Sequence, residues 1–303
     1  MRAHDRHLPC AGLASLLVVL AVGAGCGGGD AGRPALPTPS AAPANSTEPV
    51  AASPDSADDS KTMPPSEVPA SGGGEVSAPT DSGSEPVDPT QLGHITGFAT
   101  FSGAAPKRVP ITAITNTVGC KDHPETPLKE TVIVNDGKLQ NVFVYISRGL
   151  SGWAPTPVSG DPVILDQKGC LYRPHVVGMR AGQRLLARNS DGMSHNVHVI
   201  AIKNDDLNKT QGAGSKPLEI TMNREEVPVT FVCDIHPWMK AYVCVVDHPF
   251  FAVTAADGSF SIAGVPPGDY TLTAWHEKLK KVRLKVTVEP GGELTLNFQF
   301  VAR

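Results

Sequence analysis

The sequence predicts an all-β fold, and two observations carry this prediction. From residue 93 onward, short runs of alternating apolar and polar residues are separated by Gly, Pro and Asp, which is the pattern of strands and turns. No stretch shows sustained helical periodicity. A β-sandwich or barrel is the ordinary architecture for such a pattern. The expected strands cover residues 94–101, 141–146, 183–189, 195–201, 228–233, 241–247, 250–255, 260–262, 270–276, 281–288 and 294–301.

Residues 1–25 are predicted to be a targeting segment. A basic start precedes an apolar run over 11–25 that is too short and too rich in glycine for a membrane span. The run ends in Gly23-Ala-Gly-Cys26, which resembles the lipobox of bacterial lipoproteins, although Gly23 stands where that family usually has Leu. The resemblance implies a lipid anchor on Cys26 and an exported, membrane-attached protein facing the periplasm or the cell surface. An ordinary signal peptide cut near the same place is the alternative.

Residues 26–92 are predicted to be a disordered linker. Pro, Ala, Ser, Thr, Gly and acidic residues dominate it, and such a composition buries too little apolar surface to offset the entropy of ordering. The excess of acidic residues keeps the linker extended. The formal net charge of the whole chain, −4, is too small to indicate nucleic acid as a partner.

Two segments of the folded region carry metal-ligand residue types. In the segment 231–243, Cys233 ends an expected strand, an imidazole follows three residues later at His236, and a thioether follows three residues after that at Met239. The segment 189–199 supplies a second imidazole, His195, where a loop meets a strand. Two His, one Cys and a weak axial Met form a mononuclear blue-copper site. Zinc is the competing metal because Cys and His also bind it, but a thioether favours a soft, redox-active metal.

Both segments resemble those of the cupredoxins, the blue-copper domains of the amicyanin and plastocyanin type. In that family the first ligand lies in Met-Pro-His-Asn-Val-His, and this chain has Met-Ser-His-Asn-Val-His over residues 193–198. The second ligand loop of the family, Cys-x-x-His-x-x-Met, matches residues 233–239. The resemblance covers roughly residues 163–247 and implies a Greek-key β-sandwich.

The resemblance also implies a role for each matching residue. His195, Cys233 and His236 would be the equatorial ligands of one type 1 copper ion, and Met239 the axial ligand. Asn196 would tie the two ligand segments together through hydrogen bonds. His198 lies three residues beyond His195, so parity along a regular strand sends the two rings to opposite faces, and His198 is interpreted as structural.

The C-terminal run over residues 251–275 resembles the carboxypeptidase regulatory-like, transthyretin-type β-sandwich. Its Asp257-Gly258 and Pro266-Pro-Gly268 turns separate alternating strands, as hairpins require. The strands at 94–101 and 141–146 fit the two strands that precede this hairpin in the family. We therefore expect a cupredoxin domain at 159–247 to be inserted between two parts of a regulatory-like sandwich, 93–158 and 248–303. Tandem domains are the alternative. The whole arrangement also resembles methylamine-utilisation-like proteins.

The remaining cysteines and histidines carry weaker predictions. With Cys233 assigned to metal and Cys26 to lipid by resemblance, a disulfide is expected between Cys120 and Cys170, because export permits oxidation. A pair between Cys170 and Cys244 is the alternative. The other histidines lie in turn-like contexts and are interpreted as structural, with a second metal site built from some of them as the alternative: His123, His175, His248 and His276.

The expected function is one-electron transfer without substrate turnover, so the protein is predicted not to be an enzyme. The ring edge of His236, beside Pro237 and Trp238, is expected to be exposed and to pass electrons to a redox protein such as a cytochrome c or a dehydrogenase. Copper binding or delivery, or surface binding through the regulatory-like sandwich, are the alternatives. Delivery proteins usually carry Met- or His-rich tracts, which this chain lacks, and an oxidase or reductase would need further copper ligands.

Overall fold

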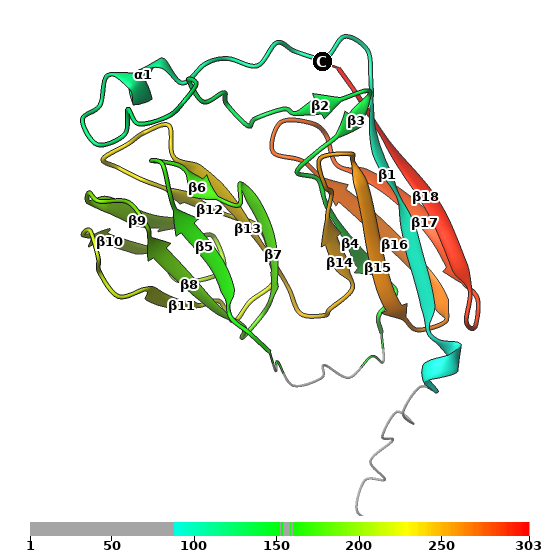
Figure 1. Ribbon diagram of the computed structural model, residues 1–303. Coiled ribbons are helices and arrows are strands. Elements are labelled where there is room, and N and C mark those ends of the chain that lie inside the picture. The colour runs from blue at the N-terminus through cyan, green and yellow to red at the C-terminus, as the bar shows by residue number, and fades with distance from the viewer. Residues whose placement is uncertain (1–87, 152, 154–157, 159, 303) are drawn as a thin grey trace, which may run out of the picture. The chain divides into compact units, whose positions relative to one another are not determined.

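The computed structural model describes residues 88–151, 153, 158 and 160–302. The predicted all-β fold is confirmed: apart from the 3-10 turn η1 (Pro89–Gln91) and the short helix α1 (Thr112–Thr115), the regular elements of the described residues are strands (Figure 1). The predicted targeting segment with Cys26 and nearly all of the predicted linker lie outside the described residues. Within the described part of the chain, no helix has the length and apolarity needed to cross a membrane.

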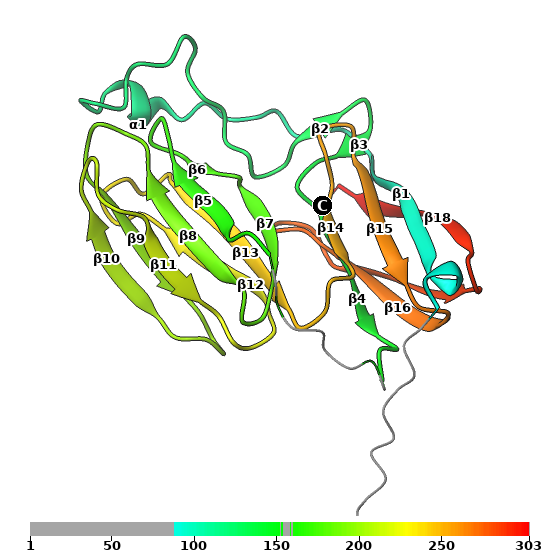
Figure 2. The ribbon, with the colours of Figure 1, turned by 60° about the horizontal axis from the view of Figure 1, so that its bottom comes forward.

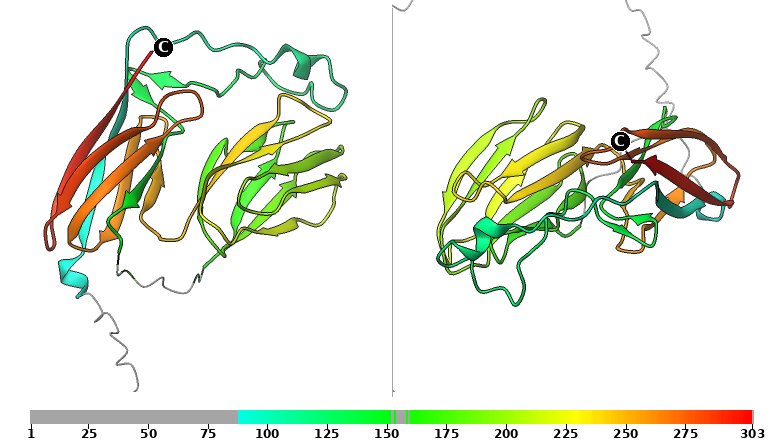
Figure 3. Two further views of the ribbon diagram at one scale, coloured as in Figure 1. Left: turned by 180° about the vertical axis from the view of Figure 1, so that it is seen from behind. Right: turned by 90° about the horizontal axis from the view of Figure 1, so that it is seen from above.

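One sandwich combines strands from both ends of the described chain, and we name it the flanking sandwich. Its first sheet has the order β15-β1-β3-β2, with β18 also paired to β1, and its second sheet has the order β14-β4-β16-β17. Figure 3 shows β1 beside β18, to which it pairs in parallel. The strands are β1 (Gly93–Ser102), β2 (Val134–Asn135), β3 (Lys138–Leu139), β4 (Phe143–Arg148), β14 (Phe251–Val253), β15 (Ser259–Val265), β16 (Gly268–Trp275), β17 (Val282–Val288) and β18 (Glu293–Val301).

The strands between β4 and β14 pair only with one another and form a second sandwich, which we name the central sandwich. One sheet has the order β10-β9-β12-β13-β7, and the other has the order β11-β8-β5-β6 (Figure 2). The strands are β5 (Val163–Gln167), β6 (Tyr172–Arg173), β7 (Val176–Arg180), β8 (Arg184–Asn189), β9 (His195–Ile200), β10 (Leu207–Gln211), β11 (Leu218–Thr221), β12 (Glu226–Val232) and β13 (Lys240–Val246).

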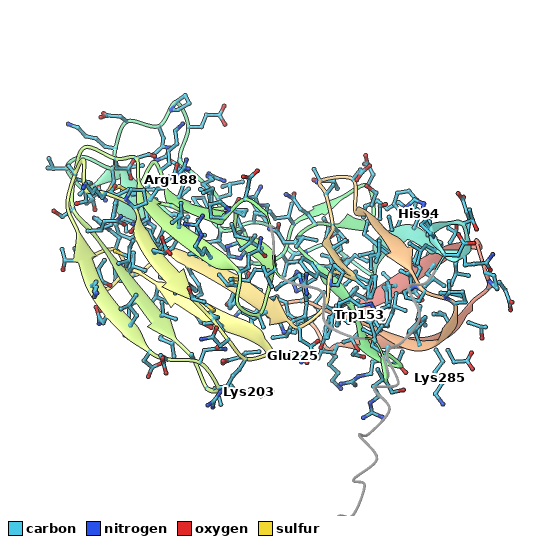
Figure 4. The ribbon with its side chains drawn as sticks, turned by 90° about the horizontal axis from the view of Figure 1, so that it is seen from below. His94, Trp153, Arg188, Lys203, Glu225 and Lys285 are labelled. Atoms are coloured by element: carbon cyan, nitrogen blue, oxygen red, sulfur yellow. A yellow bond between two sulfur atoms is a disulfide. The ribbon has the colours of Figure 1, made fainter. Side chains whose placement is uncertain are left out.

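Alternating side chains give each sandwich its own apolar core. In β1, Ile95 and Ala99 are fully buried while Phe98 between them is exposed, which is the period of two that a strand with one core face requires. The turn at Asp257-Gly258 joins β14 to β15, and Gly258 adopts a φ of +74° that side-chain-bearing residues rarely accept. Figure 4 shows the side chains that pack between the sheets.

Much of the connection between β1 and β2, residues 103–133, packs away from the sandwich from which it starts. Ile111, Ile114 and Cys120 are buried in the core cluster of the central sandwich, whereas Val132 near the end of the connection packs against the core of the flanking sandwich. An isolated antiparallel β-bridge between Pro110 and Leu128 holds the two ends of this segment together. We name residues 103–133 the strap. From sequence we expected residues 93–158 to lie in the regulatory-like sandwich, and Ile111, Ile114 and Cys120 depart from that expectation because they are buried in the central core.

Candidate metal centre

The four predicted metal ligands come from β9 and from the loop between β12 and β13. His195 opens β9, Cys233 directly follows β12, and His236 and Met239 complete the loop before β13. Because β9 and β12 pair antiparallel, the first residue of β9 lies at the end of the sheet where β12 finishes. All four side chains are at most 2% exposed. The structure therefore buries the predicted ligands together at one end of the central sandwich.

The donor atoms of His195, Cys233 and His236 converge. Nδ1 of His195 lies 2.9 Å from Nδ1 of His236, and Sγ of Cys233 lies 3.7 Å from the same His236 nitrogen. All three atoms are within 4.8 Å of one another. Around a tetrahedral metal with ordinary bond lengths, two nitrogens stand about 3.3 Å apart, and a nitrogen and a sulfur about 3.5 Å apart. The cluster has the dimensions and the donor chemistry of a copper or zinc site.

Met239 shares the core cluster of the other ligands and is fully buried. Its N–H donates a hydrogen bond to the His236 carbonyl at 2.8 Å, and its own carbonyl accepts one from the Cys233 N–H at 3.3 Å. These two bonds close the ligand loop into a tight turn that carries three of the predicted ligands. The axial role of the Met239 thioether stays a prediction.

Asp191 orients the ring of His195, a role that the sequence analysis did not assign. Oδ2 of Asp191 accepts a hydrogen bond from Nε2 of His195 at 2.8 Å, and the same carboxylate accepts the N–H groups of Gly169 at 2.6 Å and Cys170 at 2.8 Å. A carboxylate is only an acceptor, so Nε2 carries a proton and Nδ1 is the ring nitrogen that faces the cluster. The only signal in the sequence was an aspartate four residues before the ligand in a predicted loop.

The surroundings of the cluster set its protonation. Burial by itself lowers the pKa of His195, but hydrogen bonds with Cys233 and Asp191 outweigh it and raise that pKa above its ordinary value. Burial and the charge of His195 lower the pKa of His236. Burial by itself would raise the pKa of the Cys233 thiol, but the hydrogen bonds it accepts from His195 and from backbone amides lower it. A stabilised thiolate beside a neutral imidazole is the form in which these groups bind a metal.

Asn196 links the two ligand segments, as the resemblance implied. Its backbone N–H donates to Sγ of Cys233 at 3.3 Å, and its side-chain oxygen accepts the N–H of Asp234 at 3.0 Å. Its side-chain amide also donates to Oδ1 of Asn208. The hydroxyl of Tyr172, which the sequence analysis did not single out, donates to the Asn196 carbonyl at 2.8 Å. These bonds fix the thiol and the first imidazole relative to each other.

The expected exposure of His236 is wrong, because the strap covers its ring. His236 is only 2% exposed, and its Nε2 faces Sγ of Cys120 at 3.7 Å. Cys120 is joined to Cys170 by a disulfide, which is the pairing expected from the sequence. The other neighbour of the ring is Trp238, whose ring centroid lies 5.2 Å away and whose Nε1 donates to the Cys170 carbonyl at 3.0 Å. Nothing in the residue pattern indicated that Cys120 would reach this loop.

The other histidines and the remaining described cysteine lie away from the donor cluster. Three groups of side chains in the described residues have the geometry to hold a metal, and none includes the other predicted candidates His123, His175, His248 and His276. His198 bonds Asp234 through Nδ1 at 2.8 Å. Cys244 is a free thiol, and burial raises its pKa well above the ordinary value, so it is an inert part of the core.

Comparisons with known proteins match parts of the chain. The family model of the carboxypeptidase regulatory-like domain matches residues 236–301. No curated protein matches the chain.

Among solved structures, amicyanin from Paracoccus versutus is 22% identical, with a TM-score of 0.25, over 34% of this chain and 96% of its own. A purple cupredoxin from Nitrosopumilus maritimus is 19% identical, with a TM-score of 0.24, over 27% of this chain and 98% of its own. A copper-containing nitrite reductase from Thermus scotoductus SA-01 is 20% identical, with a TM-score of 0.26, over 33% of this chain. This chain spans only 27% of the length of that reductase.

Proposed function

We propose that this protein binds one type 1 copper ion through His195, Cys233, His236 and Met239 and carries single electrons between exported redox partners. The observation that supports the proposal is the convergence of two imidazole Nδ1 atoms and one thiol in a buried pocket. Bound copper would supply a one-electron couple between Cu(I) and Cu(II). We infer no substrate turnover, and hence no enzyme activity.

The donor set favours copper over zinc. The three converging donors include no carboxylate, and the ligand loop also carries the buried thioether of Met239. A thioether is a soft ligand typical of copper electron-transfer sites, whereas structural zinc sites use Cys and His throughout. The site thus has the softness expected of a copper carrier.

The surrounding residues keep the donors in one arrangement. Asp191 holds the proton of His195 on Nε2, and Asn196 holds the Cys233 sulfur through its backbone amide. The four predicted ligand residues are at most 2% exposed, so bulk water does not reach their donor atoms. A ligand set that cannot rearrange or take up water changes little when an electron arrives, which is what a carrier requires.

Because the strap covers His236, we propose that electrons enter and leave through Trp238. This side chain is half-buried and its ring lies against that of His236. Together with exposed lysines it lines a surface pocket of about 190 Å³. The lysines of this pocket are Lys129, Lys240 and Lys278, and its two carboxylates, Glu130 and Glu277, are bonded to Arg173 and His175. The charge of the lysines fits an acidic partner surface, such as that of a cytochrome c or a dehydrogenase subunit with a negative docking face.

The cellular setting of the proposal comes from the N-terminal sequence. A targeting segment ending at Cys26, followed by a long acidic linker, suits a lipid-anchored protein whose folded part stands away from the membrane. The disulfide between Cys120 and Cys170 is consistent with an oxidising compartment such as the periplasm or the cell surface.

The test is to add Cu(II) to the purified full-length protein and record its visible spectrum and its reversible reduction. We expect an intense thiolate-to-copper absorption band that is absent in Cys233→Ser and shifted in Met239→Leu. Cys244→Ser is the matched control, because this thiol is also buried but lies outside the donor cluster. A protein that binds the metal without such a band, or that retains the band in Cys233→Ser, would contradict the proposal.

A further inference from the structure

The side of the His236 ring that faces away from His195 is lined by sulfur. Sγ of Cys120 and Sγ of Cys170 each lie 3.5 Å from Sδ of Met193, and Sγ of Cys120 lies 3.7 Å from Nε2 of His236. The donor atoms of the two cysteines and His236 are within 4.8 Å of one another. Both cysteines are at most 1% exposed. Three sulfur atoms and one imidazole nitrogen are thus gathered in a second buried cluster beside the first.

As long as the disulfide is intact, neither cysteine offers a thiolate to a metal. We propose that reduction of the Cys120–Cys170 disulfide opens a second, soft-metal site, in which Cys120, Cys170 and Met193 bind Cu(I) beside Nε2 of His236. Two thiolates and a thioether form a donor set that selects Cu(I). The site goes beyond electron transfer at the first centre and does not depend on it.

The two thiols stay close together after reduction because other contacts hold both chain segments. On one side, the Asp191 carboxylate accepts the N–H groups of Gly169 and Cys170. On the other side, Ile111 and Ile114 anchor the strap in the central core. Two sulfurs bound to one tetrahedral metal at about 2.3 Å stand about 3.8 Å apart, a separation that a side-chain rotation supplies.

The strap also packs closely against the third sulfur atom, Sδ of Met193. Gly119, with a φ of +85°, passes over Met193 so closely that a Cβ at that position would lie 2.9 Å from its Sδ. The partly buried thioether therefore lies between the strap and the cysteines. Met193 is separated from the first-site ligand His195 by a single residue, so the two clusters share one loop of the chain.

The chemistry of opening the site is an exchange with an external dithiol. The dithiol becomes a cyclic disulfide, the bond between the two protein sulfurs breaks, and Cys120 and Cys170 each gain a proton. Binding of Cu(I) then displaces these thiol protons into solution. The oxidised protein is predicted to lack the second site, and the reduced protein to possess it.

The experiment counts Cu(I) bound to the full-length chain under anaerobic conditions, by competition with a chromogenic Cu(I) chelator. Cys10→Ser and Cys26→Ser are present in every sample, leaving four of the six cysteines. Reduced protein is prepared with dithiothreitol, which is then removed, and alkylation with mass measurement must find two more thiols than in the oxidised protein. We expect the reduced protein to bind one more Cu(I) per chain than the oxidised protein.

Four variants separate this site from the first centre. The double variant Cys120→Ser, Cys170→Ser should bind the same number of Cu(I) ions before and after treatment, whereas the control Cys244→Ser should still gain one. Cys233→Ser, which disables the first centre, should gain one ion on reduction, so the second site is measurable even if the proposed electron carrier fails. Met193→Leu should weaken the extra site.

The proposal is overturned if the reduced protein binds no more Cu(I) than the oxidised protein, or if the double variant still gains the extra ion. Circular dichroism of the reduced protein reports whether the strands persist. Loss of the fold on reduction would equally overturn it, since the site requires the strap to remain in place.

Discussion

The carboxylate of Asp191 accepts a hydrogen bond from Nε2 of the buried ligand His195 at 2.8 Å. The same carboxylate also anchors the backbone of Cys170, so one side chain positions both a predicted metal ligand and one half of the disulfide. Asp191 therefore links the donor cluster to the disulfide that joins Cys170 to the strap.

Asp191→Asn is expected to weaken metal binding by roughly 10–100-fold, as loss of an outer partner of a histidine ligand usually does. The neutral amide lacks the negative charge of the carboxylate, so it no longer holds the ring proton of His195 on Nε2. Copper affinity measured by chelator competition checks the prediction. Glu277→Gln is the matched control, because Glu277 is a carboxylate bonded at 2.6 Å to a different histidine, His175, outside the cluster. Equal affinities for the Asp191 variant and the wild type would refute the role.

Asn196→Ala is expected to lower the free energy of unfolding by about 1–3 kcal/mol, the usual cost of leaving a hydrogen-bonding group without its partner. The change removes the acceptor of the Asp234 N–H and the donor to Asn208, while the backbone bond to Cys233 remains. Denaturant unfolding of the metal-free protein measures the loss. Asn208→Ala should cost less, because Asn208 is exposed. A larger loss in the free energy of unfolding for Asn208→Ala than for Asn196→Ala would argue against Asn196 as the link between the ligand segments.

The buried His276 side chain should lower the free energy of unfolding in mild acid. Burial, with a further contribution from the charge of His175, lowers the pKa of His276 from 6.5 to about 4. Below pH 6.5 the unfolded chain takes up a proton that the folded chain refuses until about pH 4, so the free energy of unfolding falls across this window. The full effect is about 3 kcal/mol.

The check for His276 is the wild type compared with His276→Gln in denaturant unfolding at several pH values. The variant lacks this proton uptake. The difference in free energy of unfolding between the two proteins should therefore change by about 3 kcal/mol as the pH falls from 6.5 to about 4. Other titrating groups affect both proteins and cancel in the difference. A constant difference at all pH values would rule out His276 as the source.

The lysines beside Trp238 should control reaction with anionic redox reagents. Replacing Lys129, Lys240 and Lys278 by Gln is expected to slow oxidation of the copper-loaded, reduced protein by ferricyanide about tenfold at low ionic strength, because the positive surface attracts the anion. The effect should shrink as salt is added. Stopped-flow absorbance in the copper band measures the rate.

A control with the same charge change replaces lysines that do not line this pocket, Lys203, Lys209 and Lys216. This control should change the rate little. If both triple variants slow the reaction equally, net charge and not the Trp238 surface is responsible.

Strand prediction succeeded where apolar and polar residues alternate and failed where strands are short or irregular. The alternation in β1 and β16 is visible in the sequence, whereas β2, β3 and β6 have two residues each, too few for a period to be recognised. The strands β5, β7, β10 and β11 were also missed. In β10 only Gln211 is buried, and its buried side chain is polar, so no apolar face marks the strand.

The sequence by itself determined the residue types and spacing of the ligand loop, because Cys233, His236 and Met239 lie close along the chain and a tight turn between two strands suffices to gather them. It also determined the all-β class through the period of its apolar residues. Only the tertiary structure decided that His236 is covered, that Cys170 pairs with Cys120 and not with Cys244, and that Asp191 holds His195. The disulfide joins residues 50 positions apart, and the strap reaches it from strands of the flanking sandwich. Such contacts depend on how separate sheets pack, and the local pattern of apolar and polar residues does not specify that packing.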